Sequence, residues 1–223
     1  MLLARRAEPL AALADELGAE SHVCDVGDRQ AVERVAADVT ARHPALGLLV
    51  NNAGIPGRRS FLTIDSDRIE EVVRINYLGS VWCLRAFLPA LEAGAPAHVV
   101  NVVSVAGVVS VPASGPYSAS KHAQSAFSRA TAAELRPRGI HVHTVYPGFV
   151  ETEGFPQRGK LPGNVLTRLV IQPAQVASAI VDAVEDDRRE VFVPRWYRLP
   201  ALVQALAPGT LGRVMASRRY RRS

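Results

Sequence analysis

The amino-acid sequence predicts an α/β protein in three layers, a doubly wound parallel sheet with helices on both faces. Two observations support this fold class. Short apolar segments typical of strands alternate with longer amphipathic segments typical of helices along almost the whole chain. The strand segments are also apolar on both faces, as strands are when helices cover both sides of a parallel sheet. With 223 residues, the chain is long enough to bury one substantial core.

The elements can be assigned in order from these patterns. Runs rich in Val, Leu and Ile predict strands at residues 1–4, 21–26, 46–54, 98–104, 140–148 and 190–194. Apolar residues recurring every three or four positions predict helices at 8–17, 28–42, 66–92, 117–135 and 173–186. The segment 149–172 is rich in Gly and Pro and is irregular, and a connection of that length is usually functional.

Charge is unevenly distributed. The formal net charge is +5, but residues 188–223 hold nine arginines and one acid, Glu190, so the preceding residues are mildly acidic. A body of this kind, without aromatic and basic residues interleaved, argues against nucleic-acid binding. Cys24 and Cys83 lie in apolar runs, as expected for core thiols in a reducing cytoplasm, and there is no zinc-type Cys/His spacing. We find no targeting segment and no apolar run of membrane-spanning length.

Tyr117 and Lys121 are the first candidates for chemistry. The chain has 24 arginines and only two lysines, yet one lysine follows a tyrosine by four residues. On a helix these two side chains share one face. A tyrosine has a pKa of about 10, and a nearby positive charge lowers it towards the range useful for general acid/base catalysis. The alternative is an amphipathic pair on a helix surface.

Polar residues also stand where the predicted strands end. Each stands at the end of one strand: Asp25, Asn51 with Asn52, Ser104, and the pair Pro147–Gly148. The carboxyl ends of parallel strands meet at one edge of the sheet, where ligands bind in such folds. We therefore expect these residues to gather along one edge.

With these residues in place, the sequence resembles the short-chain dehydrogenase/reductase family over about residues 1–195. The resemblance rests on ordered motifs: CDV at 24–26, NNAG at 51–54, INYLG at 75–79, Ser104, YSASK at 117–121 and PGFVET at 147–152. It implies a Rossmann-like domain at 1–195, with 196–223 as a basic, amphipathic C-terminal extension. It also implies hydride transfer between a nicotinamide cofactor and a carbonyl or alcohol.

The resemblance assigns four catalytic roles. Tyr117 would be the general acid/base, and Ser104 would polarise the substrate oxygen. Lys121 would hold the nicotinamide ribose hydroxyls and lower the tyrosine pKa, because an ammonium with three rotatable donors suits hydroxyl groups. Asn76 would anchor a water molecule in the proton relay. A homodimer or homotetramer formed through the long helices is the expected assembly.

It also assigns cofactor contacts. From the adenine to the nicotinamide they would be Asp25, Val26, Asn51, Ala53, Gly54, Ile75, Tyr117, Lys121, Pro147, Gly148, Val150 and Thr152. Arg5 and Arg6 follow the first predicted strand, where this fold discriminates between cofactors, and no acid stands there to accept the ribose 2′-hydroxyl. An arginine suits a 2′-phosphate, so NADP(H) is favoured over NAD(H).

The chain departs from the family at its phosphate site. The glycine-rich turn Thr-Gly-x-x-x-Gly-x-Gly is absent, since no two of the sixteen glycines are two positions apart. The family's first strand, expected at the centre of the sheet, is missing as well. We therefore expect a mis-assigned start or a fragment, with strands 1–4 and 21–26 unpartnered on one side, poor folding and weak cofactor binding. The rival hypothesis is a non-catalytic dinucleotide- or partner-binding protein that has lost its phosphate loop.

Three further segments carry weaker predictions. His141 and His143 share a strand face, but with no third ligand nearby they are interpreted as ordinary sheet residues, so no metal site is predicted. By resemblance, 149–172 is a substrate lid, with Phe155 and Leu161 as apolar contacts to an unidentified substrate. The basic tail is either a peripheral membrane anchor giving access to lipophilic carbonyls, or a helical extension that closes the substrate pocket or joins subunits, and the second interpretation is favoured. A cytoplasmic location is expected in either case.

Overall fold

The computed structural model describes residues 1–57, 59–110, 114–152 and 170–215 of the chain. The predicted alternation of strands and helices is confirmed. The strands are β1 (Leu2–Ala4), β2 (Ser21–Val23), β3 (Leu48–Asn51), β4 (Ala97–Val102), β5 (Ile140–Pro147) and β6 (Glu190–Val193). The longer helices are α1 (Ala7–Leu17), α2 (Arg29–Arg42), α3 (Ser66–Val73), α4 (Gly79–Ala93), α5 (Gly115–Leu135), α7 (Pro173–Glu185), α8 (Arg198–Leu206) and α9 (Pro208–Met215). Most of the predicted lid, with Phe155 and Leu161, lies outside the described residues.

Local sequence explains where several helices begin and end. Asp28 caps α2 by accepting hydrogen bonds from the backbone amides of Gln30 and Ala31. Asp65 caps α3 in the same way. Helix α1 stops at Gly18, whose φ of 59° lies in the left-handed region that glycine adopts without strain. Each of these helices therefore has a boundary set by its own residues.

The single predicted helix at 66–92 is divided by a π-helical turn. Helices α3 and α4 are joined without a break by the five residues Arg74–Leu78, which form this turn. A π-turn inserts one extra residue per turn and re-aims the side chains around it, and such turns often occur at functional sites. The predicted catalytic residue Asn76 lies at its centre.

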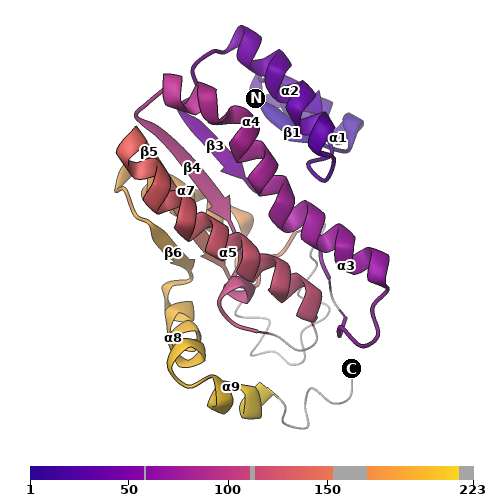
Figure 1. Cartoon of the computed structure of the whole chain (residues 1–223), viewed down its shortest axis with the longest axis vertical. Coiled ribbons are helices and arrows are strands. Elements are labelled where there is room, and N and C mark those ends of the chain that lie inside the picture. Colours follow the sequence, from indigo (N-terminus) through magenta and orange to yellow (C-terminus); the bar gives the residue numbers. More distant parts are fainter. Residues whose placement is uncertain (58, 111–113, 153–169, 216–223) are drawn as a thin grey trace.

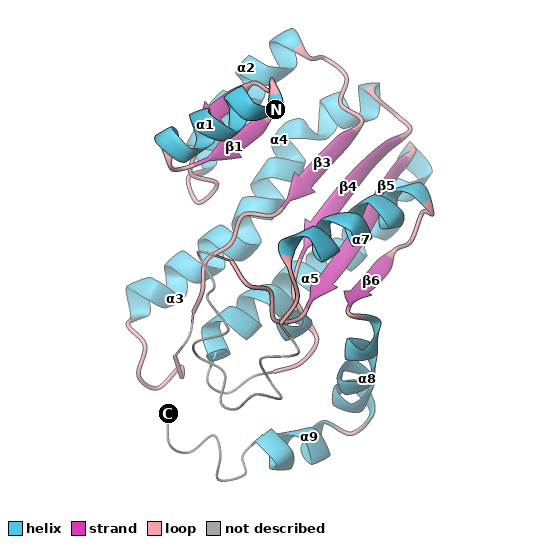
Figure 2. Ribbon diagram, turned by 180° about the vertical axis from the view of Figure 1, so that it is seen from behind, coloured by secondary structure: helices cyan, strands magenta, loops and turns pink. Residues whose placement is uncertain are grey.

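The strands are all parallel, but they form two sheets among the described residues. One contains β1 and β2, and the other has the order β3-β4-β5-β6 (Figure 2). In this part of the chain β1 pairs with β2 and with no other strand. Helices α4 and α5 lie on one face of the larger sheet and α7 on the other, which makes the three layers (Figures 1 and 2).

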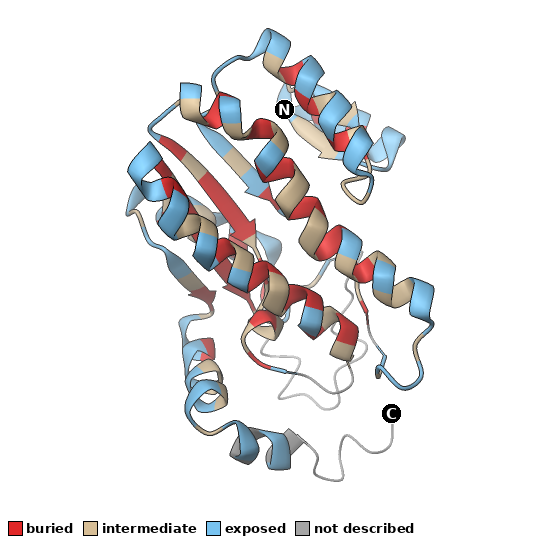
Figure 3. Cartoon of the chain, viewed as in Figure 1, coloured by how far each residue is buried: buried red, intermediate tan, exposed pale blue. Residues whose placement is uncertain are grey.

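The core follows the two faces of the larger sheet. Between the sheet and the α4–α5 layer, Leu91, Val99 and Ile140 are fully buried. On the α7 side, Val100 and Val145 pack against Val176. Figure 3 shows buried residues concentrated along the strands and the inner faces of α4 and α5. On β3 the side chains of Leu48 and Val50 are 50% and 42% exposed, so the α7-side layer does not extend over this strand.

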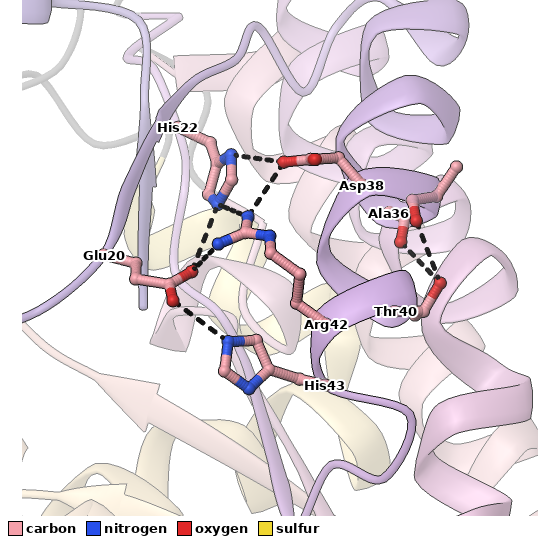
Figure 4. Close-up of polar contacts among 8 residues, drawn as sticks. Glu20, His22, Ala36, Asp38, Thr40, Arg42 and His43 are labelled. Atoms are coloured by element: carbon pink, nitrogen blue, oxygen red, sulfur yellow. Dashed lines mark hydrogen bonds and ion pairs between the residues drawn. The ribbon is translucent and has the colours of Figure 1, made fainter.

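The smaller sheet is fastened to α2 by a cluster of charged side chains. Arg42, in the last turn of α2, donates hydrogen bonds to Glu20 at 2.6 Å and to Asp38 at 2.9 Å (Figure 4). His22 of β2 lies 3.5 Å from Asp38, and His43 lies 3.2 Å from Glu20. Apart from His22, these side chains are well exposed, so the cluster fixes geometry more than it adds stability.

Candidate functional site

The site is built on one face of α5, the helix that carries Tyr117 and Lys121. Polar residues one helical turn apart run along its buried side. They are Ser120, Lys121, Gln124, Ser125 and Ser128. Apolar strands normally meet apolar helix faces, so this polar face requires internal hydrogen bonds to be stable.

Lys121 is buried, with 3% of its surface exposed. Its Nζ donates to the carbonyl oxygen of Val102 at 3.0 Å and to the amide Oε1 of Gln124 at 2.7 Å. Gln124 in turn donates to the hydroxyl of Ser80 on α4 at 2.9 Å. Both acceptors of the ammonium are uncharged, and burial lowers the pKa of Lys121 to about 7. Lys121 is therefore protonated only part of the time at neutral pH.

Asn76 links the loop after β3 to α5 through side-chain hydrogen bonds. Its Oδ1 accepts from the backbone amide of Ile55 at 2.8 Å, while its Nδ2 donates to the carbonyl of Ile55 and to the hydroxyl of Ser120. Ser120 donates to the carbonyl oxygen of Tyr117. A Cβ added to Gly54 would lie 3.4 Å from Asn76 Oδ1 and 3.7 Å from Lys121 Nζ. The NNAG loop, the π-turn and α5 therefore meet at one place.

Tyr117 and Ser104 lie at the same edge. Tyr117 is half-buried in the first turn of α5, and Lys121 Nζ lies 6.0 Å from the centre of its ring. Ser104 follows β4, where its hydroxyl accepts from the amide of Ala106 at 3.1 Å and lies 3.5 Å from the carbonyl of Pro147. Side chains from the ends of β4 and β5 and from α5 are thus brought together, as the strand-end rule predicts.

The residues expected at the adenine also lie near one another. Asp25 accepts from the amide of Gly27 at 2.8 Å, and Arg5 NH1 lies 3.9 Å from Asp25. A Cβ on Gly27 would meet Ile75 at 3.0 Å and Asp25 at 3.1 Å. Val26 packs with Ile75 in a small apolar cluster. Val26 and Ile75 thus form a small apolar surface, and the carboxylate of Asp25 and the guanidinium of Arg5 lie beside it. Arg6, the neighbour of Arg5, is exposed at the start of α1.

At the end of β5, the residues expected around the nicotinamide meet the C-terminal extension. A Cβ on Gly148 would lie 2.1 Å from the ring of Tyr197, so only glycine leaves room for this buried tyrosine. Val150 pairs with Ile171 through a parallel bridge. Ala53 and Thr152 are exposed. Tyr197 was not singled out by the sequence analysis, because its contact depends on a glycine about fifty positions away.

Asn51 is placed differently from its neighbours. Its amide donates to Asn101 Oδ1 at 2.8 Å, and Asn101 donates to Ser128 on α5 at 2.9 Å. The side chain of Asn51 is therefore used in the protein interior, and a contact with an adenosine would come from its backbone. The sequence analysis also missed Gln124 and Ser80. The available signal was the polar residues spaced one turn apart on a helix that must pack against apolar strands.

His141 and His143 of β5 both bond to other residues of the protein. His98 Nδ1 and His143 Nε2 are 3.0 Å apart, and His143 Nδ1 lies 2.8 Å from the carbonyl oxygen of Arg188. His141 bonds Asp187 at 2.7 Å. No cluster suited to a metal ion is present in the part of the chain that the structure describes. In the same part, no helix is both long and apolar enough to cross a membrane.

Comparison with known proteins connects this geometry to a family. The family model described as short chain dehydrogenase matches residues 1–160. The chain is 33% identical over 206 residues to mouse dehydrogenase/reductase SDR family member 7B, covering 87% of this chain and 62% of that protein. It is 31% identical over 208 residues to rat 17-beta-hydroxysteroid dehydrogenase 13, covering 90% of this chain and 67% of that protein. The chain thus spans less than two thirds of the mouse relative's length.

A solved structure gives the same result. A short chain dehydrogenase from Burkholderia cenocepacia in complex with NADP has a TM-score of 0.77 to this chain at 26% identity. The similarity covers 89% of this chain and 79% of the other.

Proposed function

The chain belongs to the short-chain dehydrogenase family, and we propose that it interconverts a carbonyl and an alcohol with NADP(H), using Tyr117 as the general acid/base. One observation carries the proposal. Tyr117 and Lys121 on α5, Asn76 in the π-helical turn and Ser104 after β4 come from three separate segments that lie near the carboxyl edge of one parallel sheet. Independent surface residues would have no reason to converge there.

The proposed roles follow from these positions. When bound, the nicotinamide supplies or accepts a hydride. In the reducing direction Tyr117 donates its hydroxyl proton to the carbonyl oxygen, and in the oxidising direction it takes the proton back. Ser104 hydrogen-bonds the same oxygen. Asn76 and Ser120 fix the backbone of the first turn of α5, so the phenol is held in position.

The cofactor would extend along the edge from Arg5 and Asp25 to Pro147 and Gly148. Asp25 would contact the adenine, and the exposed guanidinium of Arg5 suits a 2′-phosphate, which supports NADP(H) over NAD(H). The NADP in the related Burkholderia structure is in line with this preference. Lys121 would turn from Gln124 towards the nicotinamide ribose hydroxyls, and the remaining contacts would be those given by the resemblance.

The test is the variant Tyr117→Phe, assayed with NADPH and a panel of aldehydes and ketones. Turnover should be abolished, while NADPH affinity measured by calorimetry stays within about twofold of the original. Tyr77→Phe is the matched control, because Tyr77 makes an edge contact with Phe127 and has no proposed role in the reaction. Turnover retained by Tyr117→Phe would refute the assignment.

Cofactor preference has its own test. Arg5→Gln should weaken NADPH binding about tenfold and leave NADH binding nearly unchanged, since only NADPH carries the 2′-phosphate. An equal loss for both cofactors would contradict the proposed role of Arg5.

The second candidate is a non-catalytic dinucleotide- or partner-binding protein. The spacing of the glycines favours it, because no glycine-rich phosphate turn occurs in residues 1–223. It predicts that NADPH binds weakly or not at all and that no carbonyl is reduced, even with unmodified Tyr117. We also propose that the protein is cytoplasmic and that its Rossmann-type domain ends at residue 195. We propose that it forms a homodimer or homotetramer through α4 and α5, which light scattering would test.

A further inference from the structure

Helix α8 exposes an apolar stripe. Leu199, Leu202, Val203 and Leu206 are spaced i, i+3, i+4 and i+7, so they form one continuous face of the helix. Their exposed fractions are 65%, 55%, 41% and 77%. In a packed domain a stripe with this spacing faces the core, and here it faces solvent.

The orientation of α8 is fixed by its other side. Ala201 packs against an apolar cluster that contains Val103, Tyr146, Phe192 and Tyr197. Tyr197, directly before α8, is buried against Gly148 at the end of β5. Rotating the helix to bury its leucines would break these contacts. The exposed stripe is therefore a property of the folded chain.

The charge around the stripe indicates what covers it. Arg195 and Arg198 are exposed at the start of α8, beside the exposed indole of Trp196. Between residues 191 and 223 the sequence contains seven arginines and no acidic residue. A symmetric contact between this face and the same face of a second copy would bring two such sets of arginines together without an acid between 191 and 223 to pair with them. A surface rich in phosphate would neutralise them.

We propose that α8 lies on the surface of an anionic phospholipid bilayer. The stripe Leu199, Leu202, Val203 and Leu206 enters the boundary between headgroups and acyl chains, as the apolar face of an interfacial helix does. Trp196 lies at headgroup depth, where indoles are enriched. Arg195 and Arg198 bind lipid phosphates. Because Tyr197 contacts Gly148, this surface would hold the carboxyl edge of the sheet near the membrane (Figure 1).

The experiment is co-sedimentation of the full chain with vesicles of phosphatidylcholine containing about one quarter phosphatidylglycerol. We expect binding that weakens with added salt and is much lower with phosphatidylcholine alone. The double variant Leu202→Gln/Leu206→Gln should bind at least about tenfold more weakly. The matched control is Leu17→Gln on α1, because Leu17 is 60% exposed and lies outside the stripe.

Two further measurements keep the outcomes separate. Arg195→Gln/Arg198→Gln should also lower binding, and thermal unfolding should show all variants folded like the original chain. Binding of the leucine double variant equal to that of the original chain would overturn the proposal, as would no vesicle binding at all. Light scattering without lipid tests the other occupant. If the original chain is a dimer and the leucine double variant is a monomer, the stripe binds a second copy and the membrane proposal is overturned. Neither readout depends on enzymatic activity.

Discussion

Lys121 gives the most quantitative prediction, because its burial changes how stability depends on pH. The pKa of Lys121 is lowered from 10.5 to about 7, and burial is the cause. Between these two pH values the unfolded chain binds a proton that the folded chain has released. The free energy of unfolding should therefore rise with pH across this window. Well below pH 7 Lys121 is protonated in both states, so there it should add little to the change of stability with pH.

The magnitude follows from the two pKa values. Between about pH 6 and about pH 9.5, linkage gives a gain of about 3 kcal/mol from this one residue. Other groups also titrate in this range, so the comparison is with Lys121→Met, which has a similar length and no charge. Lys121→Met also removes the hydrogen bonds to Gln124 and Val102, so the comparison uses the change of stability with pH and not the absolute stability of the variant.

The assay is urea denaturation of both proteins at several pH values, without cofactor. The stability of the original chain relative to Lys121→Met should rise by about 3 kcal/mol across the range. Parallel curves for the two proteins would refute the reasoning, since they would mean that Lys121 has the same pKa in the folded and unfolded states.

Two further predictions concern the ends of the strands. Gly148→Ala should cost at least about 2 kcal/mol of stability in urea denaturation, because its Cβ would overlap the buried ring of Tyr197, whereas Gly47→Ala, with no atom within 4 Å of its Cβ, should be nearly neutral. Equal losses in the two variants would contradict the close contact. Burial lowers the pKa of both His98 and His143, so the unfolded chain binds more protons just below pH 6.5 and stability should fall as the pH drops. His98→Gln should make the fall between about pH 6.5 and 5 shallower in the same assay, and an unchanged slope would count against this explanation.

The sequence by itself determined the order and type of the elements and the edge at which the polar residues meet. Helix boundaries at Asp28, Asp65 and Gly18 depend on short-range capping, which is visible in the residues themselves. The meeting of Ser104 with the Pro147–Gly148 pair follows from the direction of parallel strands, which the alternation of elements already implies. The family motifs then assigned roles to residues in those positions.

Only the tertiary structure decided how the side chains at that edge are used. The bond from Lys121 to Gln124 is local to α5, but the bond from Gln124 to Ser80 requires α4 and α5 to pack together, and no local pattern encodes that distance. The division of the strands into two sheets depends on which edges find partners. The apolar stripe of α8 can be read from its spacing, but periodicity only places residues on a common face. Whether that face is buried or exposed depends on contacts made elsewhere, here those of Tyr197 with Gly148.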